Sequence, residues 1–231
     1  ITSAQTCSAT GQSILMTGAK PVYADIDYMT GNINPLDILR NVTRSTKAIL
    51  CIHWGGLPCD MAGLRSASQA IEVPLIQDAA HAIGAIFNNL PIDHYADYTM
   101  ISLQAIKTIN TIDGGLLCCK RRDKYEEGKR RRWFGIDRDR RIACEDDGYW
   151  DCNITELGFK YHMNDVCAAV GMGNLLHYDE LYAQRQSICR KYRKAFVDTD
   201  GIQLLAEAGD GNRDAHWLFT MHVQERALFV R

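Results

Sequence analysis

The sequence predicts an α/β fold in which a mostly parallel β-sheet is flanked by helices. Short apolar runs alternate with helix-like segments between residues 19 and 120. Continuous apolar runs are typical of parallel strands, because helices cover both faces of such a sheet. The chain has 231 residues, of which 46% are hydrophobic, and this is enough for one sizeable core.

The expected strands can be placed along the chain by their apolar character. Five of them are the runs at residues 20–27, 47–53, 74–78, 98–103 and 115–119. Ile1 is expected to lie inside a further strand. The alternation of apolar and polar residues over 217–224 predicts another strand near the other end.

Two helices are expected between these strands. Pro35 follows Asn34 and suits the first position of a helix, where its missing N–H is not needed, and this helix should end near Arg40. Asp60 can cap a second helix, because apolar residues recur with helical periodicity over residues 61–71.

The second half of the chain has a different residue pattern, with a basic run and a long helical segment in place of alternating strands and helices. A long helical segment is expected from residue 164 to about residue 197, broken or bent around Gly171 and Gly173. The basic run 129–132 is expected to form a charged helix face. The segment after Gly201 has the pattern of a loop and then a new strand, so a domain boundary is expected near this glycine.

Composition and charge exclude several classes of protein. The formal net charge is −2, so no basic field attracts nucleic acid. No apolar run approaches the roughly 20 residues that cross a bilayer. The nine cysteines lack the paired spacings of a zinc site or a disulfide framework, which predicts no metal and a reducing, cytoplasmic compartment.

Reactive side chains follow three of the expected strands. His53 comes after the second run, Asp78 to His81 after the third, and Ser102 to Lys107 after the fourth. Ligands bind open parallel sheets beyond the carboxyl ends of the strands. The sequence therefore predicts a binding site at this edge.

Asp78 and Lys107 carry the most specific chemistry in this group, although each has an ordinary structural explanation. An aspartate at a strand end often caps a helix, and a lone lysine is usually a surface cation. Lys107, however, is flanked by Ile106 and Ile109, and a lysine among apolar groups has a lowered pKa and can attack carbonyl groups. A Schiff-base lysine and an acid for a pyridinium nitrogen are the two groups that pyridoxal phosphate requires.

Seven ordered blocks of the sequence resemble a known family. The chain is similar to the DegT/DnrJ/EryC1/StrS group, whose members are pyridoxal-phosphate-dependent sugar aminotransferases. The blocks are VYADID (22–27), STKAI (45–49), IQDAAHAIGA (76–85), SLQAIKTINTIDGG (102–115), RWFG (132–135), ELGFKYHMND (156–165) and HWLF (216–219). The resemblance covers nearly the whole chain and implies the large domain of fold-type I (aspartate aminotransferase-like) enzymes.

The resemblance implies a role for each residue that matches the family's motifs. Lys107 would bond to the cofactor and move the proton between substrate and cofactor carbons, and Asp78 would pair with the pyridine nitrogen. His81 would lie near the hydroxyl side of the ring, and Ser102 would bind the phosphate. Cys7 stands where the family usually has an aromatic residue against the ring.

The resemblance also implies features beyond this set. The loop from His162 to Asn164 matches a segment that reaches into a neighbouring subunit's site, so an active homodimer is expected. Residues 1–200 would form the large cofactor-binding domain and residues 201–231 the start of a small C-terminal domain. The phosphate-gripping turn would lie before Ile1, so the chain is expected to be a fragment. Ile112 departs from a common glycine and is expected to alter the substrate side of the pocket.

The expected function is therefore transfer of an amino group, from glutamate, to a nucleotide-linked keto sugar. Two alternatives stay open. One is a catalytically silent or interaction-only member of the family. The other is the family's sugar dehydratase branch, whose members carry histidine in place of the lysine; Lys107 argues against it.

Overall fold

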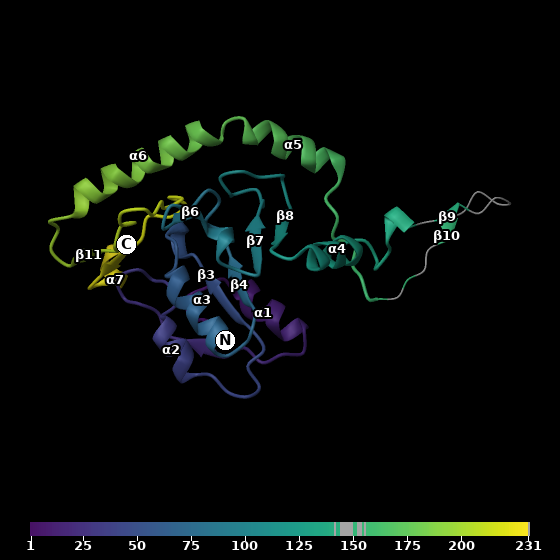
Figure 1. Cartoon of the computed structure of the whole chain (residues 1–231). Coiled ribbons are helices and arrows are strands. Elements are labelled where there is room, and N and C mark those ends of the chain that lie inside the picture. Colours follow the sequence, from purple (N-terminus) through teal and green to yellow (C-terminus); the bar gives the residue numbers. More distant parts are fainter. Residues whose placement is uncertain (141, 144–149, 152–153, 155, 231) are drawn as a thin grey trace.

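A computed structural model describes residues 1–140, 142–143, 150–151, 154 and 156–230. Its centre is a mixed, mostly parallel six-stranded sheet flanked by helices, with the strand order β2-β1-β3-β4-β7-β8 (Figure 1). Only β8 runs antiparallel to its neighbour within this sheet. The strands are β1 (Thr2–Ser3), β2 (Tyr23–Ala24), β3 (Ile49–Ile52), β4 (Leu75–Asp78), β7 (Tyr98–Ser102) and β8 (Gly115–Cys119). The predicted fold class is confirmed.

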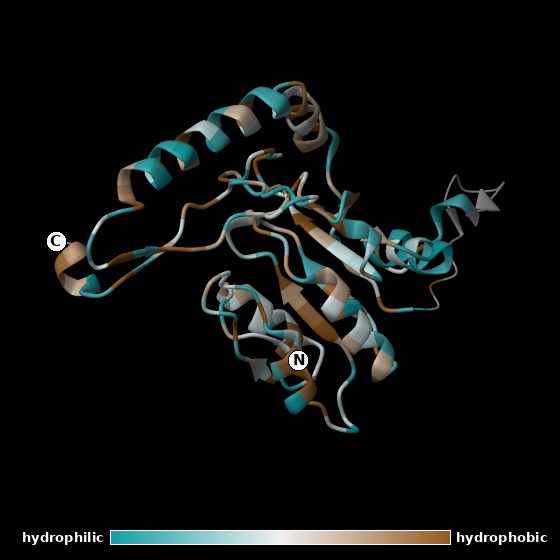
Figure 2. Ribbon diagram, turned by 60° about the vertical axis from the view of Figure 1, so that its left-hand side comes forward, coloured by the Kyte–Doolittle hydropathy of each residue, from teal (hydrophilic) through white to brown (hydrophobic). Residues whose placement is uncertain are grey.

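The main core lies between the sheet and two helices, α2 (Pro35–Arg40) and α3 (Met61–Ala70). Figure 2 shows the corresponding pattern, in which the central strands are hydrophobic. The fully buried side chains of this core include Ile38, Ile49, Met61, Leu64 and Leu75. Each buried side chain of this size stabilises the fold by roughly 1.5–3 kcal/mol relative to exposure.

The predicted starts of both helices are confirmed. The Asn34 side chain accepts a hydrogen bond from the N–H of Leu36, with Pro35 at the first helical position. The Asp60 carboxylate accepts one from the N–H of Gly63 at the start of α3. These caps satisfy N–H groups that have no partner inside the helix.

The long helical segment is present, but its interruption was predicted at the wrong place. Helix α5 (Asp165–Leu175) passes through Gly171 and Gly173 without a break, and α6 (Tyr178–Phe196) begins after a turn at residues 176–177. Gly171 instead allows close approach: a Cβ added there would lie 2.5 Å from the Thr111 Cγ2. Together α5 and α6 run along the top of Figure 1, over the loops that follow β4 and β7, where Tyr178 donates to the Ile83 carbonyl and Asn174 to the Asn110 carbonyl.

The first three residues of the basic run lie in α4 (Arg122–Arg131), which is preceded in the chain by β8, and Arg132 is the C-cap of this helix. Lys129 pairs with Asp139 at 2.8 Å, and Arg130 and Arg131 both pair with Glu156. The prediction of a charged helix face is confirmed, with its charges neutralised by acidic neighbours.

The remaining elements are short. The segment after Gly201 forms an antiparallel hairpin of β11 (Ile202–Leu204) and β12 (Met221–Val223), so the strand expected there is shorter than predicted. No helix in the described ranges combines the length and apolar character needed to span a bilayer. The elements not yet named are α1 (Ser8–Met16), α7 (Arg226–Phe229), β5 (Ile86–Phe87), β6 (Leu90–Pro91), β9 (Ile142–Ala143), β10 (Trp150–Asp151), and the 3₁₀ turns Trp54–Gly56, Ile92–His94 and Arg138–Arg140.

Cysteines in apolar runs do not all lie in the core. Cys51, in β3, is fully buried, whereas Cys118 is exposed. Cys118 belongs to β8, an edge strand in which four of the five residues are exposed within this chain. A continuous apolar run therefore did not identify a strand covered on both faces in this case.

A buried polar network crosses the middle of the sheet. His53 Nδ1 accepts a hydrogen bond from the N–H of Cys59, which requires that His53 Nε2 carries the proton and donates it to Gln77 Oε1. The Gln77 amide in turn donates to the Thr99 hydroxyl. His53 is thus a satisfied core residue that ties β3 to β4.

The free energy of unfolding is expected to decrease as the pH falls from about 6.5 toward about 4, because of His53. Burial lowers the pKa of His53 from 6.5 to about 4. Between these values the unfolded chain binds a proton that the folded chain does not, and the unfolded state is favoured by up to about 3 kcal/mol. Denaturant titrations across this pH range measure the slope. His53→Gln should reduce this slope without abolishing it, because the pKa of His81 is also lowered to about 4. An equal slope in both proteins would contradict the prediction.

Candidate active site

The site is built on the carboxyl ends of two neighbouring parallel strands. Asp78 is the last residue of β4 and lies opposite Met100 of β7, and Ser102 ends β7. The N–H of Ala79 donates to the Met100 carbonyl and holds the two strand ends in register. The Ser102 hydroxyl accepts a hydrogen bond from the N–H of Gln104 at 3.3 Å.

Lys107 lies on the loop that connects β7 to β8. The N–H of Lys107 donates to the Gln104 carbonyl, and the N–H of Thr111 donates to the Leu103 carbonyl. The Thr111 hydroxyl also donates to carbonyls of the loop. These bonds give the loop a fixed shape, so the position of the lysine backbone is defined.

Ile112 of the same loop adopts a left-handed backbone conformation, with φ of 68°. A β-branched residue is strained there, by about 1–3 kcal/mol, whereas glycine is not. This agrees with the expectation that glycine is common at this position. The loop keeps the glycine-like geometry even though the side chain, which is exposed, is bulky.

Asp78 and Lys107 affect each other electrostatically. Burial raises the pKa of the Asp78 carboxyl, while a hydrogen bond from the Ala80 N–H and the charge of Lys107 oppose this rise. Burial lowers the pKa of the Lys107 ammonium, and the charges of Asp78 and Cys7 oppose the fall. The lowered pKa agrees with the prediction from its apolar neighbours, although only Ile109 is buried and Ile106 is exposed.

Cys7 and His81 complete the group around the lysine. Cys7 precedes α1 and makes no capping hydrogen bond with its side chain. The Nδ1 atom of His81 is buried and has no hydrogen-bond partner. Burial, and then the charge of Lys107, lower the pKa of His81 to about 4, so its ring is neutral at physiological pH. The structure therefore brings Asp78, His81 and Cys7 close enough to Lys107 for their charges to interact.

The predicted loop residues have other contacts. The His162 ring packs edge-on against Trp133, with 4.2 Å between centroids. Asn164 caps α5 through a hydrogen bond from the N–H of Cys167. His53, the third strand-end residue, belongs to the buried network of the sheet. Within one chain, these three side chains have structural partners outside the Asp78–Lys107 group.

Trp217 is a member of the site for which the sequence predicted no role. The Lys107 Nζ atom lies 4.0 Å from the centroid of its ring, and the His81 ring stacks on it at 3.9 Å. Trp217 lies 110 residues beyond Lys107 in the chain, and only the HWLF block marked its segment. Side-chain contacts at this separation follow from the fold rather than from local pattern.

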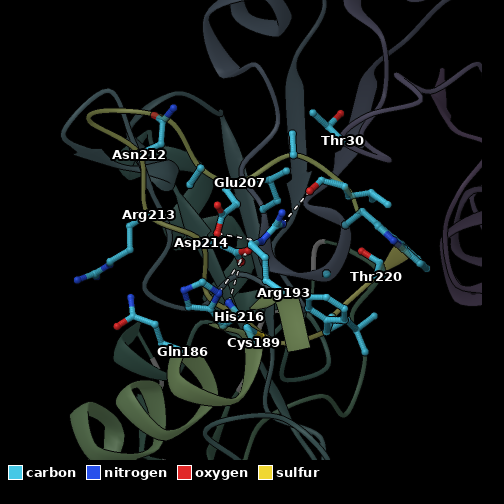
Figure 3. A pocket seen from close by; sticks show the side chains of 18 of the residues that line it. Thr30, Gln186, Cys189, Arg193, Glu207, Asn212, Arg213, Asp214, His216 and Thr220 are labelled. Carbon is cyan, nitrogen blue, oxygen red and sulfur yellow. Dashed lines mark hydrogen bonds and ion pairs between the residues drawn. The ribbon is translucent and has the colours of Figure 1, made fainter. Parts of the chain in front are cut away.

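A cavity of about 320 Å³ lies between α6 and residues 205–220. Figure 3 shows the charged side chains that face it, among them Arg193 and Glu207, which form an ion pair, and Asp214 beside His216. Lys107 and Asp78 are not among its lining residues. This cavity therefore does not contain the lysine and the aspartate, although Trp54, which meets the His81 ring, lines it.

The residues of the site fit pyridoxal phosphate. Asp78 can hold the pyridine nitrogen, Lys107 can bond to the aldehyde carbon, and the unpartnered His81 Nδ1 atom can meet a polar group of the ring. Ser102 offers a hydroxyl at the adjacent strand end, and α1 begins beside Cys7 with N–H groups suited to an anion.

Comparison with known proteins establishes the family of the chain. Residues 1–231 match the model of the DegT/DnrJ/EryC1/StrS aminotransferase family, and the chain belongs to that family. It is 35% identical over 202 residues to the uncharacterized protein MJ1066 of Methanocaldococcus jannaschii, covering 87% of this chain and 52% of the relative. It is 31% identical over 230 residues to the spore coat polysaccharide biosynthesis protein SpsC of Bacillus subtilis, covering 100% of this chain and 59% of that protein.

The same similarity is seen among solved structures. The sugar aminotransferase CalS13 of Micromonospora echinospora superposes with a TM-score of 0.89 at 28% identity, covering 99% of this chain and 62% of CalS13. The chain thus spans between half and two thirds of the length of each of these proteins.

Proposed function

We propose that this chain carries the cofactor-binding part of a pyridoxal-phosphate-dependent sugar aminotransferase. The observation that carries the proposal is the placement of Asp78 at the end of β4 and of Lys107 on the loop after the neighbouring strand β7, where the charge of each side chain affects the pKa of the other. Membership of an aminotransferase family supports the same reaction class.

The proposed amino donor is glutamate and the proposed acceptor is a nucleotide-linked keto sugar. A sugar acceptor is supported by CalS13, which is a sugar aminotransferase, and by SpsC, which takes part in polysaccharide biosynthesis. The cysteines that the structure describes as free thiols support a reducing, cytoplasmic location.

The bound cofactor would act as an electron sink for the carbon that exchanges its amino group. Asp78 would keep a positive charge at the pyridine nitrogen, because its carboxylate at the end of β4 provides the matching negative charge. Lys107 would hold the cofactor and, once its amine is released, accept and return the proton at the reacting carbon. Its lowered pKa favours the neutral amine that accepts that proton.

The two-domain division and the homodimer belong to the same proposal. Residues 1–200 would be the large domain and residues 201–231 the start of the small one, which is supported by the separate β11–β12 hairpin. A second subunit is supported by exposed apolar side chains around α5, which water disfavours. They are Leu157, Tyr161, Val166, Met172 and Leu176, the last of which is 85% exposed.

Isotope transfer tests the reaction. With ¹⁵N-labelled glutamate and a nucleotide-linked keto sugar, the full chain should yield an amino sugar that contains ¹⁵N, detected by mass spectrometry. Label transfer that requires both the donor and added pyridoxal phosphate supports the proposal. A full chain that binds the cofactor and forms no labelled sugar with any keto sugar of a broad panel would contradict it.

The homodimer is tested by charge introduced into the apolar surface. Val166→Glu together with Leu176→Glu is expected to convert the dimer to a monomer, because burying two carboxylates without partners costs several kcal/mol. Light scattering after size exclusion measures the mass. Leu36→Glu, an exposed leucine of α2, is the matched control and should stay dimeric. A double variant that remains dimeric rules out this surface as the interface.

A further inference from the structure

Trp217 contacts the reactive lysine through the face of its ring. The Lys107 Nζ atom lies 4.0 Å from the ring centroid, a geometry in which the electron-rich face attracts an ammonium group. The same indole stacks on His81, with centroids 3.9 Å apart and planes 12° apart. Trp54 meets the His81 ring in turn, with 6.0 Å between centroids. The lysine amine therefore rests on the face of Trp217, and Trp54 lies further away, behind His81.

The backbone on both sides of Trp217 is arranged to hold this position. The N–H of Trp217 donates to the Gly55 carbonyl at 2.9 Å, and the N–H of Ala215 donates to the Gly56 carbonyl. The Arg185 side chain of α6 donates to the Trp217 carbonyl. Contacts from two other segments of the chain thus fix the residue.

The residue before Trp217 is strained. His216 is not a glycine, yet its φ is 52°, in the left-handed region. Asp214 sustains this turn, since its Oδ1 atom accepts the N–H of His216 at 2.7 Å and its Oδ2 atom lies 3.5 Å from the His216 Nδ1 (Figure 3). Backbone strain of this kind persists only where surrounding contacts impose it. Here it directs the chain so that the indole reaches Lys107.

We propose that Trp217 is a positioning residue, which holds the protonated Lys107 side chain beside Asp78 through its ring face, before the cofactor binds and after the released amine has accepted its proton. The inference rests on the proposed function, because only a lysine that is released and rebound during turnover needs such a resting place. Trp217 comes from the segment after Gly201, so the placement of that segment would also set the position of the lysine.

The pKa of Lys107 distinguishes two roles of the Trp217 indole, once the other groups that face the lysine are known. These groups are Asp78 at the end of β4, Cys7 before α1, and His81, which is neutral above about pH 4. An indole that served only as an apolar cover would disfavour the ammonium, so its removal would raise the pKa of Lys107. An indole that binds the ammonium by its face favours the charge, so its removal lowers that pKa.

The test measures the pKa of Lys107 in the cofactor-free full chain, by the pH dependence of acetic anhydride labelling mapped to the Lys107 peptide. Trp217→Leu keeps apolar bulk and removes the ring face, and it should lower the pKa by about half a unit to one unit. At a fixed pH below the pKa, the fraction of neutral Lys107 amine, and with it the rate of labelling, should rise about 3- to 10-fold. Trp217→Phe retains a ring face, so the pKa of Lys107 in this variant should lie between its values in the wild type and in Trp217→Leu.

Trp54→Leu is the matched control, because Trp54 contacts His81 and not the lysine amine, and the pKa of Lys107 should stay unchanged. Circular dichroism confirms that each variant is folded. An unchanged or raised pKa in folded Trp217→Leu would overturn the proposal. Because this labelling needs no cofactor or sugar, its outcome is independent of whether the amino transfer itself is confirmed.

Discussion

Replacing Lys107 by alanine is expected to lower the turnover of amino transfer at least ~10³-fold. The lysine is proposed both to hold the cofactor and to move the proton at the reacting carbon, and a positioned acid–base group alone contributes about 10²- to 10⁴-fold. None of the other residues named in the site carries an amine that could replace it. Steady-state formation of amino sugar by the full chain measures the effect.

Two further variants make this result interpretable. Lys107→Arg keeps a positive charge beside Asp78 but has no neutral amine at physiological pH, so it should be as inactive as the alanine variant. Lys120→Ala removes an exposed lysine whose amine donates to the His94 carbonyl, outside the site, and it should retain full turnover. Lys107→Ala with wild-type turnover would sink the assignment of the site.

Asp78→Asn is expected to lower turnover about 10- to 10³-fold. The amide preserves the shape of the side chain and the acceptor for the Ala80 N–H, so the loss comes from the missing charge. An opposite charge within about 4–6 Å changes a pKa by about 1–3 units, and each unit corresponds to a tenfold change in an equilibrium. The measurement is the rate of the glutamate half-reaction, followed by the absorbance of the cofactor.

The control for this substitution is Asp60→Asn, at the start of α3. Either side chain can accept the Gly63 N–H, and Asp60 lies outside the site, so the half-reaction should be unchanged. If Asp78→Asn keeps the wild-type rate while it remains folded, the carboxylate does not hold the pyridine nitrogen.

Much of the fold could be predicted because local signals and long-range packing agree. The caps at Asn34 and Asp60 are evident from neighbouring residues, and the apolar run at β3 is buried along its whole length. The break between α5 and α6 was predicted at Gly171, because a glycine in a helical pattern suggests a bend. The structure gives this glycine another role: it leaves room for the side chain of Thr111, which is 60 residues away in the chain.

The site was predictable to a similar degree. Asp78 ends one expected strand and Lys107 follows the next one. The carboxyl ends of neighbouring parallel strands lie at the same edge of a sheet, so the two side chains could be expected near each other. His53 also follows a strand, but it turns into the sheet and binds Gln77, and sequence does not reveal that orientation. Trp217 reaches the lysine through a strained turn that depends on Asp214, for which the sequence carries no local sign.

The most direct test of the central claim is to identify where the cofactor is attached. The full chain is mixed with pyridoxal phosphate, its visible absorbance is recorded, and the bond is then fixed with borohydride and mapped by peptide mass spectrometry. The account predicts a visible band and a label on Lys107 that disappears in Lys107→Ala. A label confined to another lysine, or no trapped cofactor in the folded full chain, would contradict it.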